Sequence, residues 1–264
     1  MLRFANLASG SSGNATLIEA SEGTHCTRVL VDCGLGVREL DRRLGQLGLD
    51  LSDLDALFIT HEHADHIGHT KAVMQRCDAT LCISHGTWLA GDAPTWGLAE
   101  DRIQWVHDAC VTAIGNLQIH PFTVPHDARE PLQLTCTDGA ARLGVVTDLG
   151  HASGHVVDSL QGCHALLLET NHDADLLAQS AYPAFLKTRI AGRLGHLSNV
   201  ASAELLDQVW HPGLSFVLAA HLSERNNTPE LARSALEHSR ANRSFEIQVA
   251  SANESTPWLA VTPA

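Results

Sequence analysis

His61-Glu62-His63-Ala64-Asp65-His66 follows directly after the apolar run of residues 56–60. Four of its side chains, the imidazoles of His61, His63 and His66 and the carboxylate of Asp65, form the pattern His-x-His-x-Asp-His, and all four are of types that bind metals. A regular strand or helix cannot aim all four at one point, because its side chains alternate or rotate. On a tight loop, His61 and His63 can face one ion while Asp65 and His66 face another. Since imidazole and carboxylate suit Zn²⁺, Mn²⁺ or Fe, the segment predicts two divalent metal ions.

Three more ligand-type residues, His126, Asp148 and His221, stand at or just after the ends of other apolar runs. We expect His126 to supply the third imidazole of the first ion and His221 to complete the second. Asp148 is then the carboxylate that both ions share. Two-metal hydrolases hold their ions ~3.5–4 Å apart in this way.

Two further histidines follow a different pattern. His196 precedes a helix-like segment instead of ending an apolar run, so we expect it to reach the substrate. With Asp65 it is the expected catalytic pair, His196 protonating the leaving oxygen or stabilising its charge. His172 follows the apolar run 165–168. Substrate contact, support of the metal ligands and a plain surface loop remain equal alternatives for it.

Polar loops supply candidates for phosphate binding. The expected substrate-binding residues, besides His172, are Ser11, Ser12, Asn14, Asn226 and Asn227. A basic cluster just before His196 offers a second candidate, with a solvated helix face as its alternative. This cluster consists of Lys187, Arg189 and Arg193.

The composition limits the class of protein. A formal net charge of −13 argues against coating of nucleic acid, although it leaves room for a local phosphate pocket. Aromatic residues make up only 5%, which leaves little surface for base stacking. No apolar stretch is as long as a membrane span, and the seven cysteines contain no Cys-x-x-Cys pair. We therefore expect reduced core cysteines and a cytoplasmic protein that does not contact a membrane.

Periodicity predicts one α/β domain over residues 1–264. Apolar runs bounded by turn residues predict strands at 2–7, 15–20, 28–32, 56–60, 79–84, 117–124, 132–137, 142–147, 165–169 and 215–220. Helical spacing predicts helices at 37–47, 67–76, 174–179, 199–210 and 229–240. This order suits a sandwich of two sheets flanked by helices.

Taken together, these residues resemble the metallo-β-lactamase superfamily. Within it, the chain is similar to the WalJ/YycJ branch of bacterial metallohydrolases, relatives of ribonuclease Z and of the phosphonate-pathway (PhnP-type) phosphodiesterases. The resemblance covers nearly the whole chain, through residues 9–14, 30–34, 61–66, 125–128, 147–150, 171–173, 195–199 and 221–227.

The resemblance implies a four-layer αββα sandwich and a dinuclear site. It also implies phosphodiester hydrolysis by a hydroxide held between the ions, with 5′-to-3′ exonuclease action on DNA as the branch activity. The stretch between Asp148 and His221 is too short for the β-CASP cap domain that some nuclease relatives insert there. The choice among DNA, RNA and a small phosphodiester therefore stays open.

Two other functions fit the same ligands. A glyoxalase-II-like thioesterase or a lactonase would use the same nucleophile on a carbonyl carbon. A non-catalytic, metal-binding regulatory module would need the ligands but no additional His196 beside them. The element Gly195-His196-Leu197-Ser198-Asn199 favours a phosphoester substrate.

Overall fold

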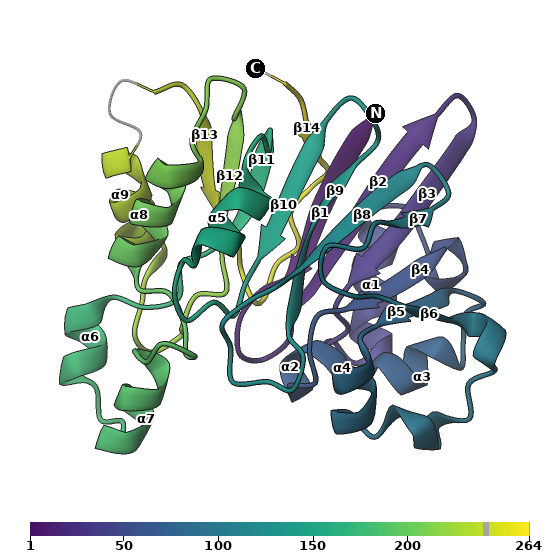
Figure 1. The fold of residues 1–264 in the computed structure, drawn as a ribbon, viewed down its shortest axis with the longest axis horizontal. Helices are drawn as coiled ribbons and strands as arrows, with labels where there is room; N and C mark the ends of the chain where they lie inside the picture. The colour runs from purple at the N-terminus through teal and green to yellow at the C-terminus, as the bar shows by residue number, and fades with distance from the viewer. Residues whose placement is uncertain (240–242, 264) are drawn as a thin grey trace.

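The computed structural model describes residues 1–239 and 243–263, and its strands form two seven-stranded sheets (Figure 1). In the first sheet the strands run antiparallel from β14 to β3 and parallel from β3 to β6. Its strands, in spatial order, are β14 (Leu259–Val261), β1 (Leu2–Ala8), β2 (Ala15–Glu22), β3 (His25–Val31), β4 (Ala56–Ile59), β5 (Thr80–Ile83) and β6 (Ile103–Trp105).

The second sheet also combines parallel and antiparallel strands. Strands β13 to β10 run parallel, and β10 to β7 run antiparallel. In spatial order they are β13 (Glu246–Val249), β12 (Phe216–Ala220), β11 (Ala165–Glu169), β10 (Arg142–Val146), β9 (Leu132–Thr137), β8 (Leu117–Thr123) and β7 (Thr112–Ile114).

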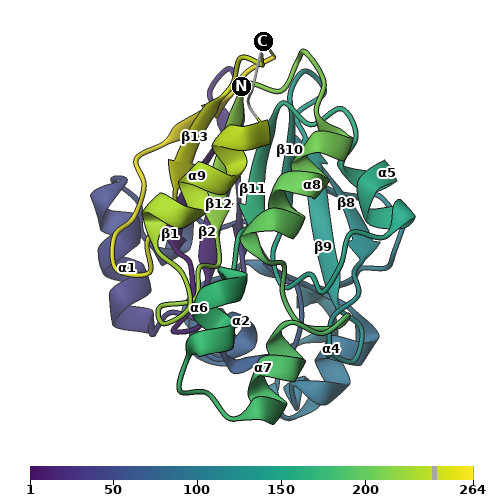
Figure 2. The same ribbon diagram turned by 90° about the vertical axis from the view of Figure 1, so that its left-hand side faces the viewer.

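Helices cover the outer face of each sheet. The first sheet is accompanied by α1 (Val37–Gln46), α2 (Ala64–Ile67), α3 (Thr70–Met74), α4 (His85–Ala90) and the 3₁₀ turns η1 (Leu51–Asp53), η2 (Ala93–Trp96) and η3 (Glu100–Arg102). The second is accompanied by α5 (Gly154–Leu160), α8 (Asn199–Val209) and α9 (Pro229–Ser239). Two short helices, α6 (Ala174–Gln179) and α7 (Ala184–Ile190), extend beyond the sheets (Figure 2).

The buried side chains fall into three layers. One cluster lies between the sheets and joins Phe4 and Phe58 of the first to Leu134 and Leu218 of the second. A second cluster packs α1 and α3 on the first sheet, and a third packs α5, α8 and α9 on the other. Because apolar surface leaving water is the main driving force of folding, these layers fix the sheets face to face. The predicted αββα sandwich is confirmed.

The carboxyl ends of the parallel strands converge at one edge of the sandwich, since parallel strands end on the same side of a sheet. Asp32 follows β3, Asp148 lies two positions beyond β10, Glu169 ends β11 and His221 follows β12. In Figure 1, helices α2, α6 and α7 lie at this edge, opposite the two chain termini. Nearly all the expected site residues therefore start from one edge.

Some element predictions need correction. The helix expected at 67–76 is divided into α2 and α3. Helix α2 begins already at Ala64, inside the segment 61–66 that carries the expected metal ligands and that we call the ligand segment. The helix expected at 229–240 is α9, which ends at Ser239, while Arg240 lies outside the described residues. Elements α4, α5, α7, β6, β7, β13 and β14 were not predicted, because each has only three to seven residues and runs of this length seldom display a clear period.

The stretch between Asp148 and His221, all of which the structure describes, contains α5, β11, α6, α7, α8 and the strand β12. No further domain is inserted there, in agreement with the sequence. Among the described residues, no helix combines the length and the apolarity that crossing a bilayer requires.

Candidate metal centre

Backbone contacts hold the ligand segment against two other loops. The carbonyl of Asp65 accepts the N–H of Asn14 at 2.8 Å, and the carbonyl of His66 accepts that of Cys33 at 2.7 Å. A Cβ atom on Gly34 would lie 1.9 Å from the Asp65 carbonyl oxygen. Only glycine permits this approach, so the turn after β3 determines how closely the segment can pack.

His61, His63 and His126 form the first group, with one ring nitrogen each within 4.8 Å of the others. Nδ1 of His63 lies 3.0 Å from Nε2 of His61 and 3.2 Å from Nε2 of His126. The opposite nitrogens are held by the protein, Nδ1 of His61 by the Thr60 hydroxyl at 2.9 Å and Nδ1 of His126 by the Gly195 carbonyl at 3.2 Å. The three free nitrogens therefore converge.

Asp65, His66 and His221 form the second group. The Nδ1–H of His66 donates to Oδ2 of Asp32 at 2.7 Å, and that of His221 donates to Oε1 of Glu169 at 2.9 Å. Both rings thus turn Nε2 toward Oδ2 of Asp65, at 3.4 Å for His66 and 3.7 Å for His221. A carboxylate on the remote nitrogen fixes the tautomer of a metal-binding histidine in this manner.

Asp148 lies between the two groups. Its Oδ2 is 3.1 Å from Nε2 of His66, and its Oδ1 is 3.8 Å from Nε2 of His126. Asp148 and His221 both have left-handed backbones, with φ of 53° and 55°, which non-glycine residues seldom adopt. Hydrogen bonds hold them there: Glu169 accepts the N–H of Asp148, and the Ser9 hydroxyl accepts the N–H of His221 at 2.7 Å. The geometry gives Asp148 access to both groups.

Two buried atoms test whether metal ions fit. Oδ2 of Asp148 and Nε2 of His221 lack a hydrogen bond of good geometry, and the atoms that they face, Nε2 of His66 at 3.1 Å and Oδ2 of Asp65 at 3.7 Å, belong to other candidate ligands. This state is costly unless another partner satisfies both atoms. Burial lowers the pKa of His221, but Asp148, Asp65 and Glu169 reverse the shift and raise that pKa to about 10. The surroundings thus favour positive charge here. Nitrogen and carboxylate donors in such a field fit two divalent cations.

Two histidines of the first group have pKa values that are shifted in the opposite direction from that of His221. Burial lowers the pKa of His61 well below its ordinary value, and burial also lowers the pKa of His126. Both imidazoles are therefore neutral near pH 7, which is the form that binds a metal.

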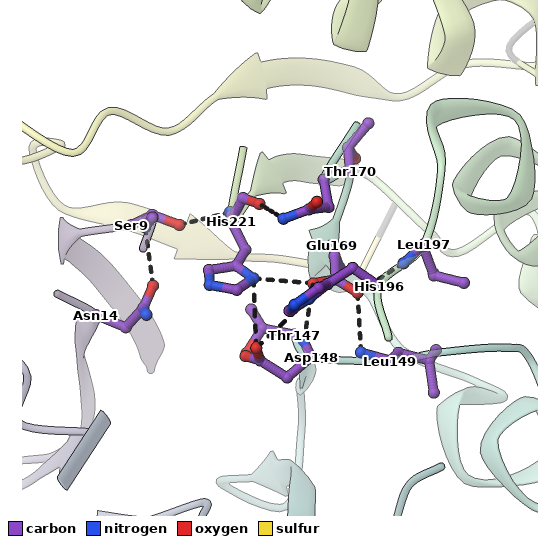
Figure 3. A network of polar contacts seen from close by, with 12 residues as sticks. Ser9, Asn14, Thr147, Asp148, Leu149, Glu169, Thr170, His196, Leu197 and His221 are labelled. Carbon is purple, nitrogen blue, oxygen red and sulfur yellow. Dashed lines mark hydrogen bonds and ion pairs between the residues drawn. The ribbon is translucent and has the colours of Figure 1, made fainter. Parts of the chain in front are cut away.

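Glu169 organises the second half of the site, although no role was predicted for it from the sequence. It is fully buried, and its carboxylate accepts the backbone N–H groups of Asp148, Leu149 and Leu197 at 2.8–3.0 Å. Oε1 also accepts Nδ1–H from His196 and from His221, each at 2.9 Å (Figure 3). One carboxylate thereby positions three of the expected site residues. Asp32 does the same for His66 and Thr60.

A signal for both carboxylates was present in the sequence. Asp32 and Glu169 each stand at the carboxyl end of an apolar strand, as His221 does. In the structure both acids are buried, and a buried carboxylate needs a partner that satisfies its charge.

His196 lies beside the ligands with 23% of its side chain exposed. Burial lowers its pKa, but the Glu169 carboxylate outweighs that effect, and the pKa of His196 lies above the ordinary value. Since Nδ1 is held by Glu169, Nε2 is the nitrogen that remains for a substrate. Glu169, His196, His221 and Asp148 each bring one nitrogen or oxygen atom within 4.8 Å of the others, because two imidazoles share the Glu169 carboxylate.

A pocket of about 400 Å³ opens over the ligands. Ser11 lines it, as do His63, Asp65 and His196. The other expected substrate residues do not line it, and most are engaged elsewhere. The side-chain amide of Asn14 donates to Asp65, and that of Asn227 donates to the carbonyls of residues 170 and 171. His172 is buried against Asn171. Asn226 is buried beside Ser223. Ser12 is exposed and does not line the pocket. Of the basic cluster, only Arg189 lines the pocket.

Comparisons with known proteins agree with this geometry. The family model described as the metallo-beta-lactamase superfamily matches residues 8–168. Exodeoxyribonuclease YycJ of Bacillus anthracis is 30% identical over 246 residues, covering 93% of this chain and 92% of that protein. Exodeoxyribonuclease WalJ of Streptococcus pneumoniae is 30% identical over 249 residues, covering 94% and 91%.

Among solved structures, the metallo-beta-lactamase fold protein YhfI from Bacillus subtilis superposes with a TM-score of 0.70. The alignment covers 97% of this chain and 99% of that one at 15% identity, which supports the fold. The chain therefore belongs to the metallo-β-lactamase superfamily of metal-dependent hydrolases, in the branch that includes YycJ and WalJ.

Proposed function

We propose that the protein is a dinuclear phosphodiesterase that acts on nucleic acid, with exonuclease action on DNA as the leading activity. The position of Asp148 carries this proposal. One of its carboxylate oxygens lies within 4.8 Å of one ring nitrogen of His61 and of one ring nitrogen of His66, and these residues belong to different ligand groups. A carboxylate that reaches both groups is what two ions acting on one phosphate require.

The ligands divide into two sets around this carboxylate. His61, His63 and His126 with Asp148 would hold the first ion. Asp65, His66 and His221, again with Asp148, would hold the second. When bound, the ions supply a water of lowered pKa and neutralise charge on the phosphate. Zn²⁺ and Mn²⁺ suit these donors, and Fe does as well.

Protein side chains do the remaining work. Burial raises the pKa of Asp65, but His221 and His66 reverse the shift and hold it well below the ordinary value. Asp65 is thus ionised and can accept a hydrogen bond from the attacking water. His196 has its Nδ1–H fixed by Glu169 at 2.9 Å and a pKa above the ordinary value. It can therefore give a proton from Nε2 to the leaving oxygen.

The names of the relatives support the choice of DNA. YycJ and WalJ are both described as exodeoxyribonucleases, and each aligns with this chain over more than nine-tenths of its length. The free cysteines support a reducing compartment such as the cytoplasm.

The test uses purified, metal-loaded protein with bis-p-nitrophenyl phosphate, a thioester, and 5′-phosphorylated single- and double-stranded oligodeoxynucleotides. We expect turnover of the phosphodiesters and release of mononucleotides from one end. Asp148→Asn should abolish hydrolysis in a protein that stays folded, whereas exposed Asp158→Asn on α5 should not. Faster turnover of the thioester than of either phosphodiester would reject the proposal in favour of a thioesterase.

A further inference from the structure

The pocket over the ligands has a second wall that contains no ligand. Tyr182, Leu186, Arg189 and Ile190 line this side, all from α7 and the turn before it. In Figures 1 and 2 this part of the chain extends past the strand ends. A substrate that fills this pocket contacts these four side chains, which we call the α7 wall.

Arg189 is oriented by one bond and is otherwise available. Its Nε donates to Oδ2 of Asp127 at 2.6 Å, and its side chain is 59% exposed. Within the described residues, no hydrogen bond involves its Nη1 or Nη2, since its one side-chain hydrogen bond is made by Nε. Asp127 is itself fixed, since its N–H donates to the Leu194 carbonyl. A guanidinium held through Nε with both Nη groups free is suited to bind phosphate oxygens.

The neighbouring cations do not share this placement. Lys187 donates to the carbonyl of Ala178 at 2.6 Å and lines a different hollow, together with His172. Arg193 contacts Nε2 of His151 at 3.0 Å. Arg189 thus stands alone in this cluster as the cation of the pocket, although the sequence did not distinguish the three.

Tyr182 gives the wall an aromatic face. It is half-buried, and Leu186 and Ile190 beside it are apolar. The guanidinium carbon of Arg225 lies 5.9 Å from the ring centroid, which adds a weak cation–π contact. Recognition of phosphate alone does not require an aromatic and apolar surface, whereas every nucleobase has a face that packs on one.

We infer that the α7 wall is a subsite for the nucleotide next to the scissile bond. Arg189 binds the scissile phosphate of this nucleotide. Tyr182 packs against its base, together with Leu186 and Ile190. The inference rests on the proposed function and specifies its substrate class. It predicts that the protein prefers phosphodiesters of nucleotides to phosphodiesters that carry no nucleoside. Stacking reads no base edge, so we expect little sequence preference.

The test compares two esters with the same leaving group and charge, p-nitrophenyl thymidine 5′-phosphate and methyl p-nitrophenyl phosphate. Arg189→Ala should raise KM about tenfold for both, by loss of a charge-assisted hydrogen bond. Tyr182→Ala should raise KM about tenfold more for the nucleotide ester than for the methyl ester, and Tyr182→Phe should restore most of that loss. Lys187→Ala and Arg193→Ala are the matched controls, for which we expect KM values within about twofold of the unmodified protein.

Calorimetric binding of thymidine 5′-monophosphate to the metal-loaded protein provides a second measurement. The Kd should rise about tenfold in Arg189→Ala and in Tyr182→Ala. The subsite is rejected if Arg189→Ala behaves like Lys187→Ala, or if Tyr182→Ala affects both esters equally. If the unmodified protein hydrolyses neither ester, the proposed function fails, and the binding experiment still decides whether a nucleotide occupies the α7 wall.

Discussion

The Nδ1 atom of His196 lies 2.9 Å from Oε1 of Glu169, a carboxylate with no exposed surface. This bond aligns the imidazole and leaves its Nε2 toward the pocket. The same oxygen accepts Nδ1–H from His221 at 2.9 Å. The residue proposed as the acid and a proposed metal ligand are therefore positioned by one atom.

An acid that protonates the leaving oxygen matters most when the leaving group is basic. We therefore expect His196→Ala to lower kcat about a hundredfold on a dinucleotide, whose leaving group is an alkoxide, and only a few-fold on bis-p-nitrophenyl phosphate. The measurement is kcat on both substrates at saturating metal. Equal losses on the two substrates would assign His196 to charge stabilisation.

Glu169→Gln should change the pH dependence of the reaction. Glu169 raises the pKa of His196, so activity that needs the protonated ring is present below that pKa and falls as the pH rises through it. Removing the charge lowers the pKa, and the alkaline limb of kcat/KM should move to lower pH. Exposed Glu204→Gln on α8 is the control, and metal content is measured in parallel. An unmoved alkaline limb with full metal occupancy would rule out this role.

Metal binding should also appear in stability. Ions that bind only the folded chain stabilise it in proportion to the logarithm of their concentration over Kd. We expect a chelator to lower Tm and added Zn²⁺ or Mn²⁺ to restore it. In metal analysis, His63→Ala and His221→Ala should each lose about one equivalent, one from each proposed ion, while His172→Ala keeps both. Loss of metal in His172→Ala would place that residue among the ligands.

Local patterns explain how much of this site the sequence could predict. His61, His63, Asp65 and His66 are close together in the chain, and His126, Asp148 and His221 stand at or near strand ends. The search for ligand-type residues at strand ends therefore selects all of them as candidates. Ser12 and Asn226 were selected for polarity alone, and polarity does not tell which way a loop residue faces. The exposed Ser12 and the buried Asn226 illustrate both outcomes.

The hydrogen-bond partners of the organising carboxylates, and the α7 wall, required coordinates for a different reason. Glu169 meets His196, His221 and Leu149 from separate elements, and such long-range hydrogen bonds leave no periodic pattern. Tyr182 and Arg189 were likewise visible as residue types only, because a helix as short as α7 shows no amphipathic repeat.

The cysteines provide a last prediction, independent of the metal centre. The sequence predicted seven reduced core thiols, and all seven are free, but Cys26 and Cys110 are exposed. Burial raises the pKa of Cys33 and of Cys82 to about 12 and that of Cys163 to about 11. Since the thiolate is the nucleophile, we expect only Cys26 and Cys110 to react rapidly with Ellman's reagent at about pH 8, and the other five after denaturation. Cys26→Ser and Cys110→Ser should each remove one fast thiol, and a third fast thiol in the native protein would show that the core opens.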